Sequence, residues 1–313
     1  MKYGLQLNMA KTLSSHIYVL VFCSSLLIST YCQTDLWSPE NSVASFIFGD
    51  SLFDAGNNNY IKNASFRADY PTGRFSDGQL IPDFIAEWLK LPLLPPYLQP
   101  GNHDYVYGVN FASAGAGAPV ETRQGTVCND YVVYVASNST VFQSSSKEDY
   151  VEIVIGNLTS VIKEIWTCKY RSYGCAPFTR GLNTSGGCLE EVTALIKLHN
   201  RALSKVLEDL QKELKGFEYS VLDFYTSLSK RMNKPSKYGF KVRKVACCGS
   251  GPFRGILDSG VKHEYELCDD PTEYLFFDSA HLTEKAYNQL GKLFGSGSPD
   301  VTWPYNLKTL LKA

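Results

Sequence analysis

Short apolar runs alternate with longer segments of helical periodicity along the chain. Residues 43–48 have the pattern of a buried strand, because they are mostly apolar, β-branched or aromatic and are closed by Gly49. The same pattern predicts strands at 105–112 and 219–224. Apolar residues at helical spacing predict helices at 80–89, 150–166, 189–214 and 285–294. Strands that alternate with helices favour an α/β fold with a largely parallel sheet.

The first residues have the pattern of a secretory signal peptide. Lys2 and Lys11 precede an apolar run at 17–28, and small and polar residues follow up to Gln33. The apolar run is shorter than the ~20 residues that a membrane-spanning helix needs, and no amphipathic period supports a buried N-terminal helix instead. We expect a signal peptide at 1–33, one domain at 34–313 and no transmembrane anchor.

Sequons and cysteines also indicate export. The glycosylation sequons begin at Asn63, Asn138, Asn157 and Asn183, although chance could produce any single one. Cys23 and Cys32 of the nine cysteines fall in the predicted signal peptide, and the remaining seven leave at least one thiol unpaired within the chain. Their spacing is not a zinc pattern, so we expect disulfides rather than a metal site. A net charge of −1 gives no indication of a nucleic-acid partner.

The end of the first predicted strand is a candidate catalytic position. Ligands of α/β sheets bind beyond the carboxyl ends of the strands, and Ser51 lies at such an end. If a helix began after Ser51, its backbone N–H groups would face a developing oxyanion. Asp50 or Ser51 could instead merely cap that helix, which is the more common role of these residue types.

A serine nucleophile needs a base, and the candidate is His281. Asp278 lies three residues before it, close enough on a turn or helix to hold the imidazole in one tautomer. The alternative is a solvated Asp–His pair without function. Oxyanion donors could come from the glycines of 108–117 and from the amide of Asn129, although glycines often serve only in turns.

Taken together, these stretches resemble the plant GDSL esterase/lipase family, a branch of the SGNH hydrolases. Residues 48–59, Phe-Gly-Asp-Ser-Leu-Phe-Asp-Ala-Gly-Asn-Asn-Asn, look like its first block, and residues 71–78 like the segment that follows it. Residues 108–117 resemble the second block, Cys128-Asn129-Asp130 the third, and Asp278 with His281 the last. The resemblance covers most of the chain after the predicted signal peptide.

The resemblance implies a fold and a reaction. The fold would be a three-layer α/β/α SGNH-hydrolase-like domain with a mostly parallel central sheet. The reaction would be hydrolysis of carboxylic esters of lipids or other acyl compounds through an acyl-enzyme, without metal or organic cofactor. Ser51, Asp278 and His281 would be catalytic, and Gly115 and Asn129 would form the oxyanion hole. The resemblance also implies disulfides between Cys175 and Cys188, and between Cys268 and either Cys247 or Cys248.

The chain departs from the family pattern at two places. Only residues 118–127 separate the second and third blocks, where the family has a helix and a strand, and Cys128 replaces a glycine. Residues 167–173 are polar where the family has an apolar strand. We therefore expect one or two central strands to be absent, as in an alternatively spliced product or in an imperfectly assigned gene.

Three functions remain open on this sequence. The first is a secreted esterase or lipase of the plant cell wall or apoplast. The second is an inactive variant that acts, if at all, as a secreted binding glycoprotein, because lost strands threaten the fold and the support of Asn129. The third is a carbohydrate acetylesterase or an acyltransferase that uses the same residues.

Overall fold

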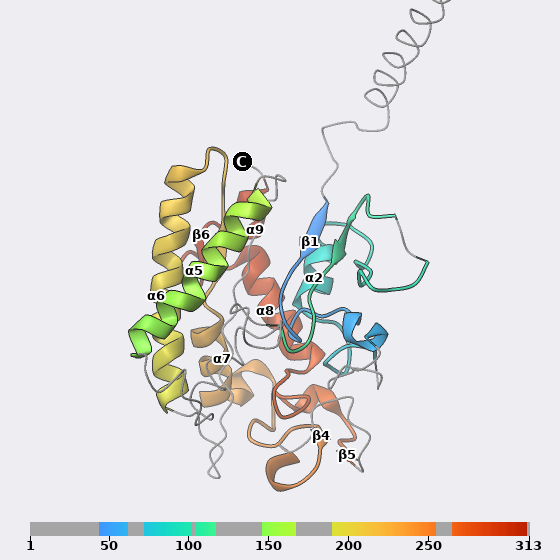
Figure 1. Ribbon diagram of the computed structural model, residues 1–313. Coiled ribbons are helices and arrows are strands. Elements are labelled where there is room, and N and C mark those ends of the chain that lie inside the picture. Colours follow the sequence, from blue (N-terminus) through green and yellow to red (C-terminus); the bar gives the residue numbers. More distant parts are fainter. Residues whose placement is uncertain are drawn as a thin grey trace, which may run out of the picture. The chain divides into compact units, whose positions relative to one another are not determined.

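Short strands and longer helices follow one another along the chain (Figure 1). The structure is a computed structural model that describes residues 44–61, 72–101, 104–116, 146–166, 190–254 and 265–311. The strands are β1 (Ser45–Ile47), β2 (Gly108–Asn110), β3 (Ser220–Leu222), β4 (Cys248–Gly249), β5 (Glu266–Leu267) and β6 (Thr302–Pro304). The helices are α2 (Ile81–Trp88), α5 (Lys147–Trp166), α6 (Glu190–Glu213), α7 (Phe224–Asn233), α8 (Glu284–Ser296) and α9 (Leu307–Leu310).

The first predicted strand pairs with the second. Strand β1 is parallel to β2, with Ser45 opposite Gly108 and Ile47 opposite Asn110. Gly108 has a φ of +101°, and a Cβ atom at this position would collide with the carbonyl group of Ser45. Glycine is therefore required where the two backbones approach each other.

The third predicted strand has a partner that the apolar pattern did not reveal. Strand β3 pairs antiparallel with β6, whose three residues include a proline, and β4 pairs antiparallel with β5. Within the described residues, the strands therefore form three two-stranded sheets, of which only β1–β2 is parallel. The four predicted helices are confirmed as α2, α5, α6 and α8, with ends that differ by up to three residues.

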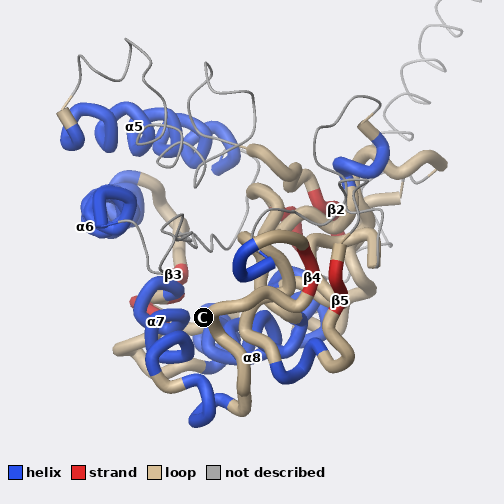
Figure 2. The backbone as a smooth tube through the Cα atoms, turned by 90° about the horizontal axis from the view of Figure 1, so that it is seen from below, coloured by secondary structure: helices blue, strands red, loops and turns tan. Residues whose placement is uncertain are grey.

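Two apolar clusters hold these elements together. One surrounds α8, which packs against α2 and contacts β3, β6 and α9. The other lies along α5 and α6, which are side by side in both views of the backbone (Figures 1 and 2). Helix α5 begins with a reciprocal cap, in which the side chains of Ser146 and Asp149 each accept a hydrogen bond from the other's backbone N–H.

All described residues belong to one compact unit, Ala44–Ala313. The predicted signal peptide at 1–33 lies outside the described residues and stays a prediction. None of the described helices has the length and apolar character needed to cross a membrane.

Candidate active site

Ser51 lies in a tight turn directly beyond the carboxyl end of β1. The turn closes through a hydrogen bond from the Phe53 N–H to the Asp50 carbonyl at 3.0 Å. The Asp50 carboxylate accepts the N–H of Leu52 at 3.0 Å. The helix that we considered after Ser51 is not present, and the described residues 51–61 contain a 3-10 helix at Asn57–Tyr60 instead.

Asp54 gives the physical reason for this difference. One of its oxygens accepts the N–H groups of Gly56 at 2.8 Å and Asn57 at 2.6 Å. The other accepts those of Asn58 at 3.3 Å and Ala114 at 3.0 Å. A carboxylate that binds successive backbone amides competes with the carbonyl groups to which a helix would pair them. The chain therefore folds around the buried Asp54 side chain.

Buried asparagines join this loop to the segment after β2. The Asn57 amide donates to the carbonyls of Asn110 at 2.7 Å and Ala112 at 2.8 Å. The Asn110 amide donates in return to the Phe53 carbonyl at 2.7 Å. The Ser113 N–H also donates to the Gly49 carbonyl at 3.0 Å. The loop that carries Ser51 is thus fixed to the carboxyl end of its neighbouring strand.

Asp278 and His281 lie on a turn just before α8. Both carboxylate oxygens of Asp278 are close to His281 Nδ1, at 2.7 and 2.8 Å. One of them also accepts the N–H groups of Ala280 at 2.8 Å and His281 at 2.7 Å. Asp278 is 1% exposed and His281 5%. Burial and these fixed hydrogen bonds orient the imidazole ring.

The structure brings Ser51 against this pair, although 230 residues separate it from His281. The Ser51 Oγ atom lies 2.7 Å from His281 Nε2, within hydrogen-bonding distance. With Nδ1–H donating to Asp278, Nε2 is the nitrogen that accepts the serine proton. The arrangement Ser51–His281–Asp278 can therefore take up a proton from the serine hydroxyl.

A second segment holds the histidine turn from the other side. The Phe75 ring lies 5.0 Å from the His281 ring, centroid to centroid. The Ser76 hydroxyl donates to the Leu282 carbonyl at 3.0 Å, and the Asp77 carboxylate accepts the first-turn N–H of α8 at Glu284, at 2.8 Å. Our sequence analysis gave these residues no individual role, because contacts between segments so far apart leave no local pattern.

Three aspartates around the site have shifted acidities. Burial raises the pKa of Asp50, while the Leu52 N–H and His281 oppose this shift. Burial likewise raises the pKa of Asp54 and of Asp77, against the backbone N–H groups that each accepts. These carboxyl groups therefore depend on their hydrogen-bond donors to be tolerated in the interior.

Of the two predicted oxyanion donors, the structure describes Gly115 but not Asn129. Gly115 lies on the loop after β2 with a φ of +89°, and a Cβ there would meet no atom within 4 Å. Glycine is favoured here because of the positive φ, since there would be room for a side chain. Asn129 lies outside the described residues. Both roles stay predictions.

One predicted disulfide is present. Cys247 pairs with Cys268, and Cys248 is a buried free thiol whose pKa is raised to about 11 by burial and by the nearby Asp278. The N–H groups of Cys247 and Cys248 donate to the carbonyls of Phe276 and Phe277, directly before Asp278. The predicted Cys175–Cys188 pair lies outside the described residues.

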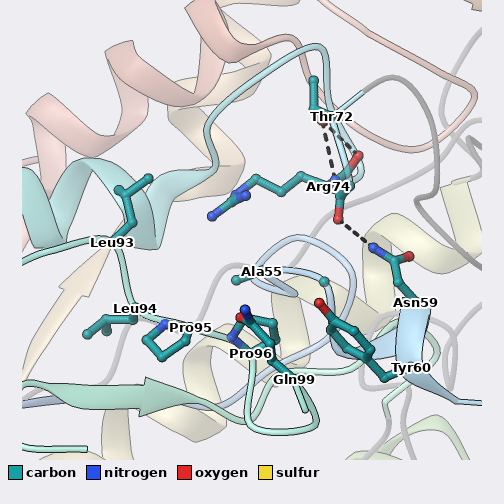
Figure 3. Close-up of a pocket in the computed structure, with 12 residues that line it drawn as sticks. Ala55, Asn59, Tyr60, Thr72, Arg74, Leu93, Leu94, Pro95, Pro96 and Gln99 are labelled. Carbon is teal, nitrogen blue, oxygen red and sulfur yellow. Dashed lines mark hydrogen bonds between the residues drawn. The ribbon is translucent and has the colours of Figure 1, made fainter. Parts of the chain in front are cut away.

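A pocket of about 360 Å³ lies beside the loop that follows Ser51 (Figure 3). Its lining residues come from 55–60, 72–74 and 93–99, and Asn59 donates across it to the Gly73 carbonyl at 3.0 Å. Neither Ser51 nor His281 lines this pocket, so we assign it no part in the chemistry. In the described part of the chain, no three His, Cys, Asp or Glu side chains gather as ligands for a metal ion.

Comparison with known proteins identifies the family. The sequence profile described as GDSL-like Lipase/Acylhydrolase matches residues 46–294. The chain belongs to this family of carboxylic ester hydrolases. The family's domain is a three-layer α/β/α fold. GDSL esterase/lipase 2 of Arabidopsis thaliana is 45% identical, over 87% of this chain and 90% of the relative. GDSL lipase of Tanacetum cinerariifolium is 40% identical, over 97% and 95%.

The alignments show that this chain lacks residues that a relative has, and one relative is named inactive. The alignment with GDSL esterase/lipase 2 extends over 339 positions, but 87% of 313 residues is only about 272 residues. About 67 aligned positions therefore have no residue of this chain, which is shorter than its relative inside the aligned region. A further relative, 31% identical over 85% of this chain, is named inactive GDSL esterase/lipase-like protein 25 of Arabidopsis thaliana.

Proposed function

We propose that this GDSL family member hydrolyses carboxylic esters with Ser51 as nucleophile, His281 as general base and Asp278 as the residue that orients the base. The observation that carries the proposal is the continuous contact from Ser51 Oγ to His281 Nε2 and from His281 Nδ1 to Asp278. Family membership supports the same chemistry. Lipids or other acyl esters are the proposed substrates.

The proposed reaction has two steps, formation and hydrolysis of an acyl-enzyme. His281 Nε2 takes the proton of Ser51 as Oγ bonds to the ester carbonyl carbon, and the carbonyl oxygen becomes an oxyanion. The proposed oxyanion donors are the backbone N–H of Gly115 and the side chain of Asn129. His281 then gives its proton to the departing alcohol, which leaves an acyl-enzyme on Ser51. A water molecule then attacks the acyl-enzyme while His281 takes its proton. The acid is released, and His281 returns the proton to Ser51 Oγ.

The test uses Ser51→Ala and a matched control, Ser204→Ala. Ser204 also has a hydrogen-bonded hydroxyl, which donates to the Asn200 carbonyl on α6 at 2.9 Å. Ser51→Ala is expected to lower kcat for a short p-nitrophenyl ester at least about a thousandfold and to abolish fluorophosphonate labelling. Ser204→Ala should keep both. Turnover by Ser51→Ala at the wild-type rate would exclude Ser51 as the nucleophile.

An inactive family member is the second candidate, and the length deficit within the aligned region favours it. Lost segments leave sheet edges and buried groups without support. The same experiment separates the two candidates. If the folded wild-type protein neither reacts with fluorophosphonate nor hydrolyses the ester, the chain is an inactive family member.

We also propose that the protein is exported to the plant cell wall or apoplast after removal of residues 1–33. The Cys247–Cys268 disulfide supports this, because such bonds persist in oxidising compartments. Of the four sequons, only Asn157 lies in the described residues, half-buried on α5. N-terminal sequencing of protein from the culture medium is expected to start near residue 34. Retention inside the cell with residues 1–33 intact would contradict the proposal.

A further inference from the structure

Tyr287 lies in the first turns of α8 and has no solvent exposure. Its hydroxyl oxygen accepts the N–H of Leu282 at 3.2 Å. Leu282 directly follows His281 in the chain. The tyrosine hydroxyl therefore contacts the backbone next to the proposed catalytic base, while its ring is fixed in the apolar cluster around α8.

Both ends of one peptide unit are held at this place. The carbonyl group of His281 accepts the Phe277 N–H at 2.8 Å, and the N–H of Leu282 is bound by Tyr287. These two hydrogen bonds fix the plane of the peptide that joins His281 to Leu282. Because that plane fixes ψ of His281, it restricts the position of the Cα atom from which the imidazole projects toward Ser51.

The surroundings of the hydroxyl are unusual for a tyrosine. Its electrostatic neighbours include the carboxyl groups of Asp278, Asp50 and Asp77. Burial is the largest cause that raises the pKa of Tyr287 well above its ordinary value, and these carboxylates raise it further. This shift favours the protonated, neutral hydroxyl over the phenolate.

We propose that Tyr287 is a positioning residue for His281, which acts by binding the Leu282 N–H through its hydroxyl. The inference rests on the proposed ester hydrolysis and deepens it. A positioning residue changes the placement of the base and leaves the ester-binding surface unchanged. Its loss should therefore lower kcat and leave KM nearly constant.

The test is Tyr287→Phe, which removes the hydroxyl and keeps the ring. The matched control is Tyr219→Phe, because Tyr219 is also buried, at 3% exposure, but packs in the cluster along α5 and α6. Turnover of a p-nitrophenyl ester is measured per site titrated with fluorophosphonate, together with the labelling rate and thermal unfolding. Tyr287→Phe is expected to lower kcat and the labelling rate about tenfold or more, with KM within about twofold. Tyr219→Phe should change only stability.

Wild-type kcat in folded Tyr287→Phe, or an equal fall in Tyr219→Phe, would overturn the proposal. If Tyr287→Phe does not fold in plain buffer, all variants are compared in sucrose, which is excluded from the protein surface and favours the compact state. An unchanged kcat in Tyr287→Phe folded under these conditions would overturn the inference in the same way. Ser51→Ala is measured alongside. If it retains turnover, the proposed function fails; if it is inactive while Tyr287→Phe is fully active, only the present inference fails.

Discussion

The loop of residues 49–58 and the helix pair α5–α6 are buried by different kinds of side chain. In the loop, the buried groups include the carboxylate of Asp54 and the amides of Asn57 and Asn58. In the helix pair, they are mostly aliphatic and aromatic residues such as Leu195 and Leu207. Directional hydrogen bonds stabilise the loop, whereas burial of apolar surface stabilises the helix pair.

This difference determines what each region tolerates. An apolar interior depends on volume, so removing carbon atoms weakens it and exchanging similar side chains changes little. A polar interior depends on which atoms donate and which accept, so a change of one atom type can unpair several groups at constant volume. The proposed nucleophile lies in the polar region, where atom types are fixed most strictly.

Of the changes that separate the two regions, Asp54→Asn should have the largest effect on activity, although it alters atom type and almost no volume. Two of the four backbone N–H groups around Asp54 would then face an amide NH₂ instead of an acceptor. We expect the free energy of unfolding to fall by about 2 kcal/mol, since the penalty of burying a charge disappears at the same time. Activity should fall more than a hundredfold per folded molecule, because the turn at Ser51 shifts.

The matched change in the helix pair is Leu207→Ala, at a side chain with no exposure. It should lower the free energy of unfolding by about 2–5 kcal/mol and leave kcat per titrated serine close to the wild-type value. Urea unfolding and fluorophosphonate titration measure both quantities. If Leu207→Ala lowered kcat per site as much as Asp54→Asn, the two regions would not differ in the way proposed.

The same contrast explains what the sequence could predict. Helical spacing reveals α5, α6 and α8 because an apolar stripe repeats along one element. The helix that we considered after Ser51 is absent, because the Asp54 side chain accepts the N–H groups that a helix would use, and apolar spacing does not indicate this. Strand β6 was missed since three residues that include a proline carry too little pattern.

In the candidate site, the sequence could pair residues that are close along the chain more readily than residues that are far apart. Asp278 and His281 are neighbours in sequence, so a local argument could pair them. Ser51 is 230 residues from His281, so only the chemical need of a serine nucleophile for a base, and then the resemblance to the family, connected the two in the sequence. Tyr287 and Phe75 contact the histidine turn from other segments, and spacing along the chain does not indicate such contacts.

A smaller effect concerns the one buried imidazole of the helix pair, His199, which is 2% exposed. Burial lowers its pKa to about 4, whereas an unfolded histidine titrates near 6.5. Between these values the unfolded state binds a proton that the folded state does not, so the free energy of unfolding falls as the pH decreases. From pH 7 to pH 5 this one group should contribute a loss of about 2 kcal/mol.

Urea unfolding of the wild type and of His199→Gln at both pH values isolates that contribution, because all other titrating groups are common to the two proteins. Glutamine stays neutral throughout, so the variant should lose about 2 kcal/mol less than the wild type on acidification. An equal loss in both proteins would mean that His199 is already solvated in the folded state. The interior of the helix pair would then be more open to water than its packing indicates. The two regions would differ less in the kind of interior that they have.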